Sequence, residues 1–380
     1  MSRPDQVAAS VTAMLKYQSA YGSFVASPDS GQYQFCWLRD SSFICRALDA
    51  AGEQAAAARY HRWVAGALGP LRPAMADAAA LAGRPGASRL LPPARFALDG
   101  STVADDWPNF QIDGYGAWIW SLREHLRLGG DRGLFDEIRA VVDATWRYLD
   151  VMALHPCFDV WEEHGDRVHT STLACVQAGL SAAADLLGEP RAAARAAEVE
   201  SFLLDLAARY GRFPKSASDG EVDASALWLC APLGIVGPAE PAMAATVDAI
   251  KAELDLDGGI RRYPGDTFFG GGAWPVLTAS LGLYWLAAGD GRAAGECLAW
   301  IEAKFDAEGR LGEQFGGERV NPAMYREWVH RWGHPARDLL WSHAMYVLLA
   351  LAAGISPDAT QIPEGSTSDT AFPEGHGPAT

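Results

Sequence analysis

The chain has 380 residues, of which 49% are apolar, and a formal net charge of −16. The apolar fraction is enough for a large core, and the negative charge repels the phosphate backbone of nucleic acids, so we expect no nucleic-acid partner. A neutral ligand such as a sugar meets no such repulsion, and some of the 14 tryptophans could serve as stacking platforms for it.

The amino-terminal segment and the cysteines bear on where the protein works. Residues 1–10 lack the apolar core of a signal peptide, and no apolar run in the sequence is long enough to span a bilayer. The six cysteines form no C-x-x-C pair and lie in apolar segments, so we interpret them as buried thiols rather than disulfides. These features predict a cytoplasmic protein with no membrane partner. The absence of heptads and of apolar surface runs predicts a monomer.

Helical periodicity dominates the chain, and long alternating strand patterns are missing. Glycine breaks such as Gly188 separate the periodic segments. The predicted helices cover residues 5–18, 39–51, 53–67, 72–83, 112–128, 133–151, 169–187, 190–210, 222–234, 240–255, 273–288, 291–304 and 336–353. About twelve helices in short-looped pairs indicate an all-α antiparallel array that can close into a ring of inner and outer helices.

The segments between these helices are of two kinds. Five loops, at residues 22–39, 90–109, 157–167, 258–272 and 305–335, are long and rich in aromatic and charged residues, which is typical of functional loops. Residues 355–380 instead contain mainly proline, glycine, serine, threonine and acidic residues, so we expect this tail to contribute little to the core. The sequence therefore predicts one domain over residues 1–354, followed by a polar tail.

The first loop ends in Trp37-Leu38-Arg39-Asp40, at the entrance of a predicted helix. An arginine and an aspartate beside a tryptophan could hold sugar hydroxyls through charge-assisted hydrogen bonds. The alternative is that Asp40 only caps the helix, as such residues often do.

Two other loops offer a similar mixture of ring, cation and carboxylate. One runs from Trp107 to Asp113, and the other from Arg261 to Asp266, with Trp274 further on. Such groups could bind a sugar, or they could form structural salt bridges at the bases of the loops.

The stretch Asp159–Glu163 has the sequence D-x-W-E-E and lies just before a predicted helix. An apolar ring such as Trp161 beside a carboxyl disfavours the charged form and raises its pKa, which suits a general acid. The alternative is a solvated acidic pair at a helix entrance, where negative charge is favoured in any case.

Glu313 lies between a glycine and an amide in the last long loop. A carboxylate in this setting could be held ionised and hydrogen-bonded, as a base that activates water must be. It could equally be a turn residue with no chemical role. In the same loop His330 and His334 are four residues apart, but Pro335 follows and no H-E-x-x-H pattern is present, so we predict no metal site.

Taken in order, these segments resemble the catalytic domain of glycoside hydrolase family 15, the glucoamylase family. Residues 37–40 are similar to its W-x-R-D segment, residues 159–163 to its D-x-W-E-E segment and residues 262–267 to its R-Y-P-x-D-T segment. Residues 336–342 resemble its closing A-R-D-L-x-W-S helix. The resemblance extends over about residues 30–350 and implies an (α/α)6 barrel, inversion at the anomeric carbon and no cofactor.

The resemblance also implies roles for single residues. Glu162 falls on the general acid of the family and Glu313 on its general base. Arg39 and Asp40 fall on residues that bind the terminal glucose, and Glu163 on a residue that binds the sugar in the next subsite. The full set of predicted substrate-binding residues is Trp37, Arg39, Asp40, Trp107, Asp113, Trp161, Glu163, Arg262 and Trp274.

The chain also departs from the family's pattern, because it has no room for an amino-terminal β-sandwich and lacks a starch-binding module. These departures favour a short oligosaccharide over starch. The stretches 98–100, 113–115, 163–164 and 169–172 look more like bacterial members that act on α-1,6 linkages, such as isomaltose glucohydrolases. We therefore predict an inverting exo-acting α-glucosidase that releases β-glucose from short α-1,6-linked glucosides.

Several alternatives stay open from the sequence alone. The second subsite could instead suit α-1,4 glucosides or trehalose. A phosphorylase on a similar barrel is a further possibility, although a second catalytic carboxylate at Glu313 would repel phosphate. The alternative from another functional class is a non-catalytic sugar-binding protein, which turnover of any glucoside would exclude.

Overall fold

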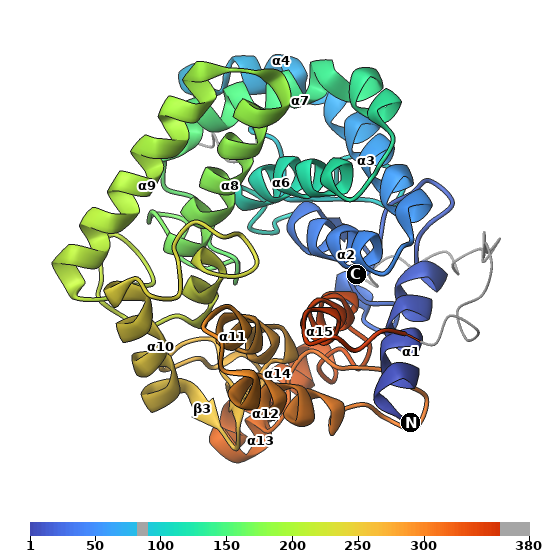
Figure 1. Cartoon of the computed structure of the whole chain (residues 1–380), viewed down its shortest axis with the longest axis vertical. Helices are drawn as coiled ribbons and strands as arrows, with labels where there is room; N and C mark the ends of the chain where they lie inside the picture. Colours follow the sequence, from blue (N-terminus) through green and yellow to red (C-terminus); the bar gives the residue numbers. More distant parts are fainter. Residues whose placement is uncertain (82–89, 358–380) are drawn as a thin grey trace.

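The helices alternate between an outer and an inner ring (Figure 1), as seen in the computed structural model, which describes residues 1–81 and 90–357. In these residues the outer ring consists of α1 (Arg3–Lys16), α3 (Gln54–Leu68), α7 (Arg132–Met152), α9 (Pro190–Tyr210), α10 (Pro241–Leu254) and α12 (Gly291–Glu302). The inner ring consists of α2 (Leu38–Ala50), α6 (Asp113–Arg127), α8 (Thr170–Leu187), the 3-10 helix η4 (Ala224–Leu229), α11 (Pro275–Ala287) and α15 (Leu340–Ala352). Consecutive inner helices are in contact, and α15 closes the ring against α2. The predicted (α/α)6 barrel is confirmed.

Sequence patterns explain which helices form each ring. The inner helices α11 and α15 contain no aspartate, glutamate, lysine or arginine, and such uniformly apolar helices are stable only when surrounded by protein. The outer helix α7 instead buries one face, with Leu134, Ile138, Val142 and Leu149 at helical spacing, and exposes charged residues on the other.

A glycine pair brings α6 and α8 into close contact. A Cβ atom at Gly116 would lie 2.2 Å from the carbonyl oxygen of Cys175, and one at Gly179 would lie 2.5 Å from the Cα atom of Gly116. Only glycine leaves enough space for the two backbones here. A larger residue at either position would push apart two neighbouring helices of the inner ring.

The remaining described elements are short and lie in the connections. They are η1 (Gly31–Tyr33), η2 (Gly69–Leu71), α4 (Arg72–Ala76), α5 (Ala78–Leu81), η5 (Phe268–Gly270), α13 (Gly317–Val320) and α14 (Pro322–Trp332). The connections also contain two antiparallel strand pairs. β1 (Cys36–Trp37) pairs with β2 (Arg95–Phe96), and β3 (Asp255–Leu256) pairs with β4 (Gly259–Ile260).

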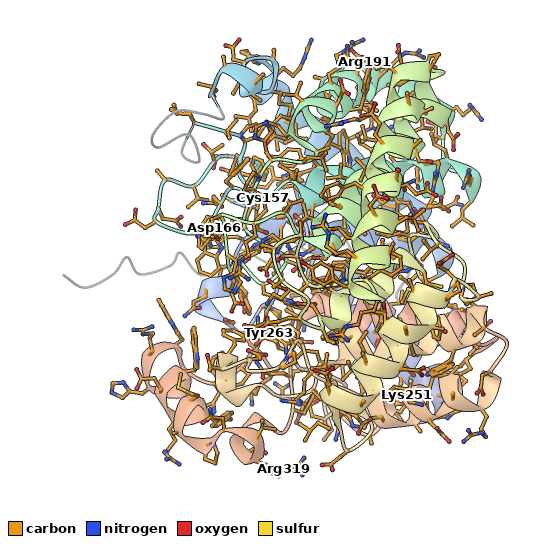
Figure 2. The ribbon with its side chains drawn as sticks, turned by 90° about the vertical axis from the view of Figure 1, so that its left-hand side faces the viewer. Cys157, Asp166, Arg191, Lys251, Tyr263 and Arg319 are labelled. Carbon is orange, nitrogen blue, oxygen red and sulfur yellow. The ribbon has the colours of Figure 1, made fainter. Side chains whose placement is uncertain are left out.

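The long loops all lead from an outer helix into an inner one. Because the two rings run antiparallel, these loops gather at one end of the barrel, where the inner helices begin. In Figure 2, Asp166 and Tyr263, from two of the loops, lie toward the left-hand side, whereas Arg191, at the start of the outer helix α9, lies toward the right. The aromatic and charged residues of the five long loops therefore lie at one end of the barrel.

Three predicted elements differ from the structure. The helix predicted at 222–234 is only the 3-10 helix η4, because Pro232 lacks a backbone N–H and its ring blocks a continuing α-helix. The helix predicted at 72–83 is divided into α4 and α5, and its last two residues lie outside the described residues. The loop predicted at 305–335 contains α13 and α14.

Other predictions concern the cysteines, the membrane and the tail. All six cysteines are free and buried, as predicted. Among the described residues we find no helix that is both long and apolar enough to cross a bilayer. The domain boundary predicted at residue 354 stays a prediction, because most of the tail, residues 358–380, lies outside the described residues.

Candidate active site

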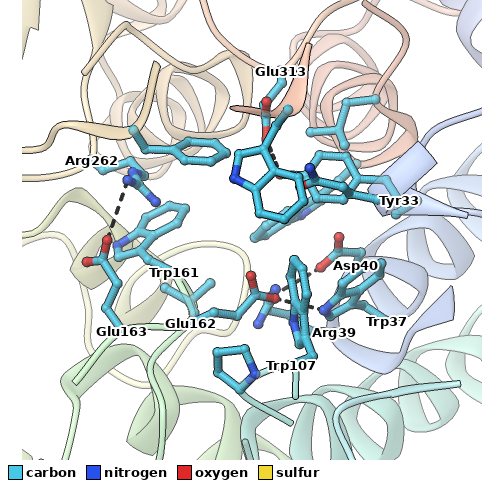
Figure 3. A pocket seen from close by; sticks show the side chains of 18 of the residues that line it. Tyr33, Trp37, Arg39, Asp40, Trp107, Trp161, Glu162, Glu163, Arg262 and Glu313 are labelled. Atoms are coloured by element: carbon cyan, nitrogen blue, oxygen red, sulfur yellow. Dashed lines mark hydrogen bonds and ion pairs between the residues drawn. The ribbon is translucent and has the colours of Figure 1, made fainter. Parts of the chain in front are cut away.

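A pocket of about 560 Å³ opens at the end of the barrel where the inner helices begin (Figure 3). Every predicted site residue except Asp113 lines it. The other lining residues are Ala26, Gln32, Tyr33, Asp105, Asp106, Pro108, Val160, Phe268, Trp328, Arg331, Trp332, Leu339 and Trp341. A pocket of this size, aromatic with a few convergent charges, is typical of a site for a small ligand.

Glu162 is carried by a tight turn ahead of α8. The side chain of Asp159 accepts hydrogen bonds from the backbone N–H groups of Trp161 and Glu163, each at 2.9 Å. This turn places Glu162 at φ 65°, in the left-handed region that a non-glycine residue seldom adopts. Backbone strain of this kind is concentrated at functional sites, and here it directs the carboxyl into the pocket.

The surroundings of Glu162 favour its protonated form. Removal from water raises the pKa of this carboxyl, whereas the nearby charge of Arg39 opposes the increase. The indole Nε1 of Trp37 donates a hydrogen bond of 2.8 Å to Oε1 of Glu162 and fixes its orientation. A carboxyl whose protonated form is favoured in this way is suited to donate a proton to a bound molecule.

Glu313 lies on the opposite side of the pocket from Glu162 (Figure 3). Its side chain is almost fully buried, and its backbone N–H donates to the carbonyl oxygen of Ala336 at 2.9 Å. The hydroxyl of Tyr33 donates a hydrogen bond of 2.7 Å to Oε1. Oε2 is buried and makes no hydrogen bond with any residue that the structure describes, so it can accept one from a water molecule.

Burial raises the pKa of Glu313 to about 7. The hydrogen bond from Tyr33 and the positive charge of Arg262 oppose this increase. A carboxyl with a pKa near 7 can both hold and release a proton at neutral pH, which is the property that a general base needs.

Arg39 is fixed by carboxylates at the start of two inner helices. Its Nη1 donates to Oδ2 of Asp113 at 2.9 Å and to Oε1 of Gln111 at 3.0 Å, and its Nε donates to Oδ1 of Asp40 at 3.1 Å. Burial raises the pKa of Asp40 to about 6. Asp113 was predicted to bind substrate, but the structure places it behind Arg39, away from the pocket surface.

Arg262 is held by a neighbouring carboxylate in the same way as Arg39. Its Nε and Nη2 donate to the two oxygens of Asp266 at 2.7 and 2.5 Å, which fixes the plane of the guanidinium. Trp161 and Trp274 lie around it, with ring centroids 5.1 and 5.6 Å from Cζ. Glu163 accepts a hydrogen bond from Tyr263 at 2.5 Å and lies 3.8 Å from Arg262.

The indoles of Trp37 and Trp107 form an aromatic wall beside Glu162. Their centroids are 5.8 Å apart at an interplanar angle of 72°. The buried Arg95 supports this wall, because its guanidinium lies 4.2 Å from the ring centroid of Trp107 and pairs with Asp105. Rings and paired charges of this kind suit a polyhydroxylated ligand, which offers both apolar faces and hydroxyl groups.

Comparison with known proteins decides the family. The model of the glycosyl hydrolases family 15 matches residues 2–307 of the chain. The chain belongs to this family. The family 15 chain is therefore a glycoside hydrolase, and the resemblance seen in its sequence is confirmed. Glu313 lies beyond the matched segment, and longer alignments with relatives extend past it.

Individual relatives agree with this membership. The family 15 chain is 38% identical over 357 residues to the isomaltose glucohydrolase of Kribbella flavida, an alignment that covers 91% of this chain and 92% of the relative. A glycosidase variant solved in complex with glucose has a TM-score of 0.86 and 37% identity, over 93% of this chain and 98% of that one. The glucoamylase from Saccharomycopsis fibuligera, with a TM-score of 0.68 and 15% identity over 92% and 94% of the two chains, shows the shared fold.

Some pocket residues of this family 15 enzyme were missed in the sequence. Tyr33 has no local signal, because its partner Glu313 is distant in the chain and only the fold brings them together. Trp341 belongs to the A-R-D-L-x-W-S segment, but the pattern itself does not reveal that its ring lines the pocket. Trp328 and Trp332 are four residues apart, and their shared face would have been visible had α14 been predicted.

Proposed function

We propose that this glycoside hydrolase is an inverting exo-acting α-glucosidase. It releases β-glucose from the non-reducing end of short α-1,6-linked glucosides such as isomaltose. The observation that carries the proposal is the position of Glu162 and Glu313 on opposite sides of one pocket, each with a pKa raised by burial.

Glu162 acts as the general acid. Its raised pKa keeps a proton available, and the hydrogen bond from Trp37 directs the carboxyl toward the glycosidic oxygen. Protonation of this oxygen lets the leaving sugar depart as a neutral alcohol.

Glu313 acts as the general base. Its unpaired Oε2 accepts a proton from a water molecule, which then attacks the anomeric carbon from the side opposite the leaving group. Inverting enzymes keep their two carboxyl groups about 6.5–9.5 Å apart to leave room for this water. The hydrogen bond from Tyr33 holds the other oxygen and sets the direction of Oε2.

The remaining pocket residues bind the sugar. Arg39, Asp40 and Arg262 are each fixed by a neighbouring charge, so they can hold the hydroxyls of the terminal glucose without reorganising. Trp37 and Trp107 offer aromatic surface to its apolar faces. Glu163 lies beyond the acid, where it can bind the sugar on the reducing side of the cleaved bond.

The preference for α-1,6 linkages is supported by the isomaltose glucohydrolase of Kribbella flavida, which is 38% identical over nearly the whole chain. We expect glucose release from isomaltose to exceed that from maltose and from trehalose when the three are assayed in parallel. Faster cleavage of maltose or trehalose would leave the glucosidase assignment in place and contradict the linkage. Release that depends on added phosphate would instead indicate a phosphorylase.

Removal of either catalytic carboxyl tests the two roles. We predict that Glu162→Gln and Glu313→Gln each lower kcat on isomaltose by about 10²–10⁴-fold, the usual contribution of general acid or base catalysis. Glu318→Gln is the matched control, because it makes the same change at an exposed position outside the pocket and should leave kcat unchanged. Near wild-type turnover by either pocket variant would refute the assignment.

We also propose that the enzyme works as a monomer in the cytoplasm. Six free, buried thiols suit a reducing compartment. Light scattering of the purified protein at micromolar concentration should give the mass of one chain, and a stable dimer would contradict this part of the proposal.

A further inference from the structure

A buried lysine lies beneath the turn that carries Glu162. The side chain of Lys215 is 2% exposed, and Nζ lies 3.8 Å from Asp159, 3.7 Å from Glu163 and 3.7 Å from Asp223. The same Nζ is 3.1 Å from the ring centroid of Tyr263. A buried ammonium group is costly unless nearby charges compensate it, and here three carboxylates and an aromatic face do so.

Each of the three carboxylates belongs to, or is hydrogen-bonded to, the segment Trp161–Glu163 that lines the pocket. Asp159 accepts hydrogen bonds from the backbone N–H groups of Trp161 and Glu163. Asp223 accepts a hydrogen bond of 2.8 Å from the indole Nε1 of Trp161. Glu163 itself lines the pocket. The charge of Lys215 therefore offsets mutual repulsion among the groups that position Trp161 and Glu163.

The backbone of Lys215 is held independently of its side chain. Its N–H donates to the carbonyl oxygen of Glu221 at 2.8 Å, and its own carbonyl accepts from the N–H of Thr170 at 3.1 Å, at the start of α8. A neutral side chain of similar length at this position should therefore preserve the path of the loop.

We propose that Lys215 is a positioning residue for the leaving-group side of the pocket, an inference that rests on the proposed glucosidase function. Lys215 holds Trp161 and Glu163 where they receive the sugar on the reducing side of the cleaved bond, next to the carboxyl of Glu162. Without the lysine, the three carboxylates lose the positive charge that they share, and their mutual repulsion favours a displacement of Trp161 and Glu163.

Two substrates that differ in their leaving group test this role. Isomaltose needs both a bound leaving sugar and its protonation, whereas α-glucosyl fluoride presents no second sugar and a far better leaving group. We expect Lys215→Met to lower kcat/KM on isomaltose by about 100-fold, as a misplacement of about 1 Å can. On α-glucosyl fluoride, which needs little acid assistance, the loss should stay below about threefold.

The ratio of kcat/KM on isomaltose to kcat/KM on α-glucosyl fluoride distinguishes a positioning defect from a folding defect, because a loss of folded protein lowers both values equally. Lys215→Arg keeps the charge and should hold the ratio within about tenfold of the wild-type value, since a charge-assisted contact is retained. Lys251→Met is the matched control, because this exposed lysine also lies over an aromatic ring, 5.1 Å from the centroid of Trp285, outside the pocket.

An equal loss on both substrates in Lys215→Met, or no loss on isomaltose, would overturn the proposal. So would a ratio in Lys215→Arg as low as that in Lys215→Met. The wild-type enzyme tests the proposed function separately, since it must cleave isomaltose. If it instead cleaves maltose or trehalose, the same ratio is measured with that disaccharide.

Discussion

At the scale of single residues, the balance of forces on Glu313 determines how the site responds to pH. Burial raises its pKa, and the hydroxyl of Tyr33 lowers it by donating a hydrogen bond to the ionised form. Tyr33 itself stays protonated, because burial and the charge of Glu313 raise its own pKa well above the usual value. The tyrosine is therefore a permanent hydrogen-bond donor to Glu313.

Replacement of Tyr33 by phenylalanine should move the acidic limb of the pH–rate profile to higher pH. Without the donated hydrogen bond the ionised form of Glu313 is less stable, so its pKa rises and a higher pH is needed to generate the base. One hydrogen bond to a charged group is worth about 1.5 kcal/mol, or about one pH unit. The measurement is log(kcat/KM) on isomaltose against pH. An acidic limb that stays in place or moves to lower pH would contradict the role of Tyr33.

The same burial predicts a cost in stability at neutral pH. The folded-state pKa of Glu313, about 7, exceeds the ordinary value of 4.5. The folded state therefore holds the proton more tightly, and stability falls as pH rises from about 4.5 to about 7. At pH values above this window, the buried ionised carboxyl lowers the free energy of unfolding by on the order of 3 kcal/mol.

Glu313→Gln should remove this penalty, even though it lowers kcat. We predict that it raises Tm at pH 8, where the wild-type carboxyl is ionised, and leaves Tm unchanged at pH 4, where both side chains are neutral. Scanning calorimetry at the two pH values checks the difference. A variant that is less stable than wild type at pH 8 would show that the ionised carboxylate is better compensated than its burial indicates.

Local sequence could reveal Glu162 and Glu313 as candidates, but not which neighbours control them. The pattern D-x-W-E-E places a ring and a second acid beside Glu162, and these are visible in one stretch of chain. Tyr33, Lys215 and Asp223 act on the site from distant segments, so only the folded structure brings them together. Asp113 shows the converse, because its sequence position suggested the pocket surface whereas its contact is with Arg39.

At the scale of elements, α14 is the clearest difference between expectation and structure. Its start carries the usual signals, since the side chain of Asn321 accepts from the N–H of Met324 at 3.2 Å and Pro322 takes the first helical position. The helix buries none of its residues fully, so its sequence lacks the apolar stripe on which the prediction of helices depends. Trp328 packs this helix against Phe268, and the centroids of the two rings are 4.8 Å apart.

The position of α14 predicts an effect on longer substrates. Trp332 is 51% exposed yet lines the pocket, so its ring is available to a sugar beyond the first two. We predict that Trp332→Ala lowers kcat/KM on isomaltotriose by about 2–10-fold, the value of one aromatic contact, and leaves α-glucosyl fluoride unaffected. Tyr21→Ala changes an exposed aromatic residue outside the pocket and serves as the control. Equal losses on both substrates would refute this role.

At the scale of the whole molecule, the barrel explains why loops from across the sequence form one pocket. Alternation of outer and inner helices makes every inner helix begin at the same end, and the loops that line the pocket are the ones that lead into inner helices. The periodicity of the helices predicted this ring because most of them are long and have one buried face or are wholly apolar. It failed at η4, the fourth inner element, where Pro232 prevents a longer helix and the neighbouring inner helices α8 and α11 define its place.

The central claim is that two glutamates on opposite sides of this pocket cleave an α-glucoside with inversion. Proton NMR of the enzyme with isomaltose, followed from the first minute at the anomeric signals, tests it most directly. The account predicts that β-glucose appears before any α-glucose, which then forms only by mutarotation. If α-glucose appears first, the reaction retains configuration, and Glu313 does not deprotonate an attacking water.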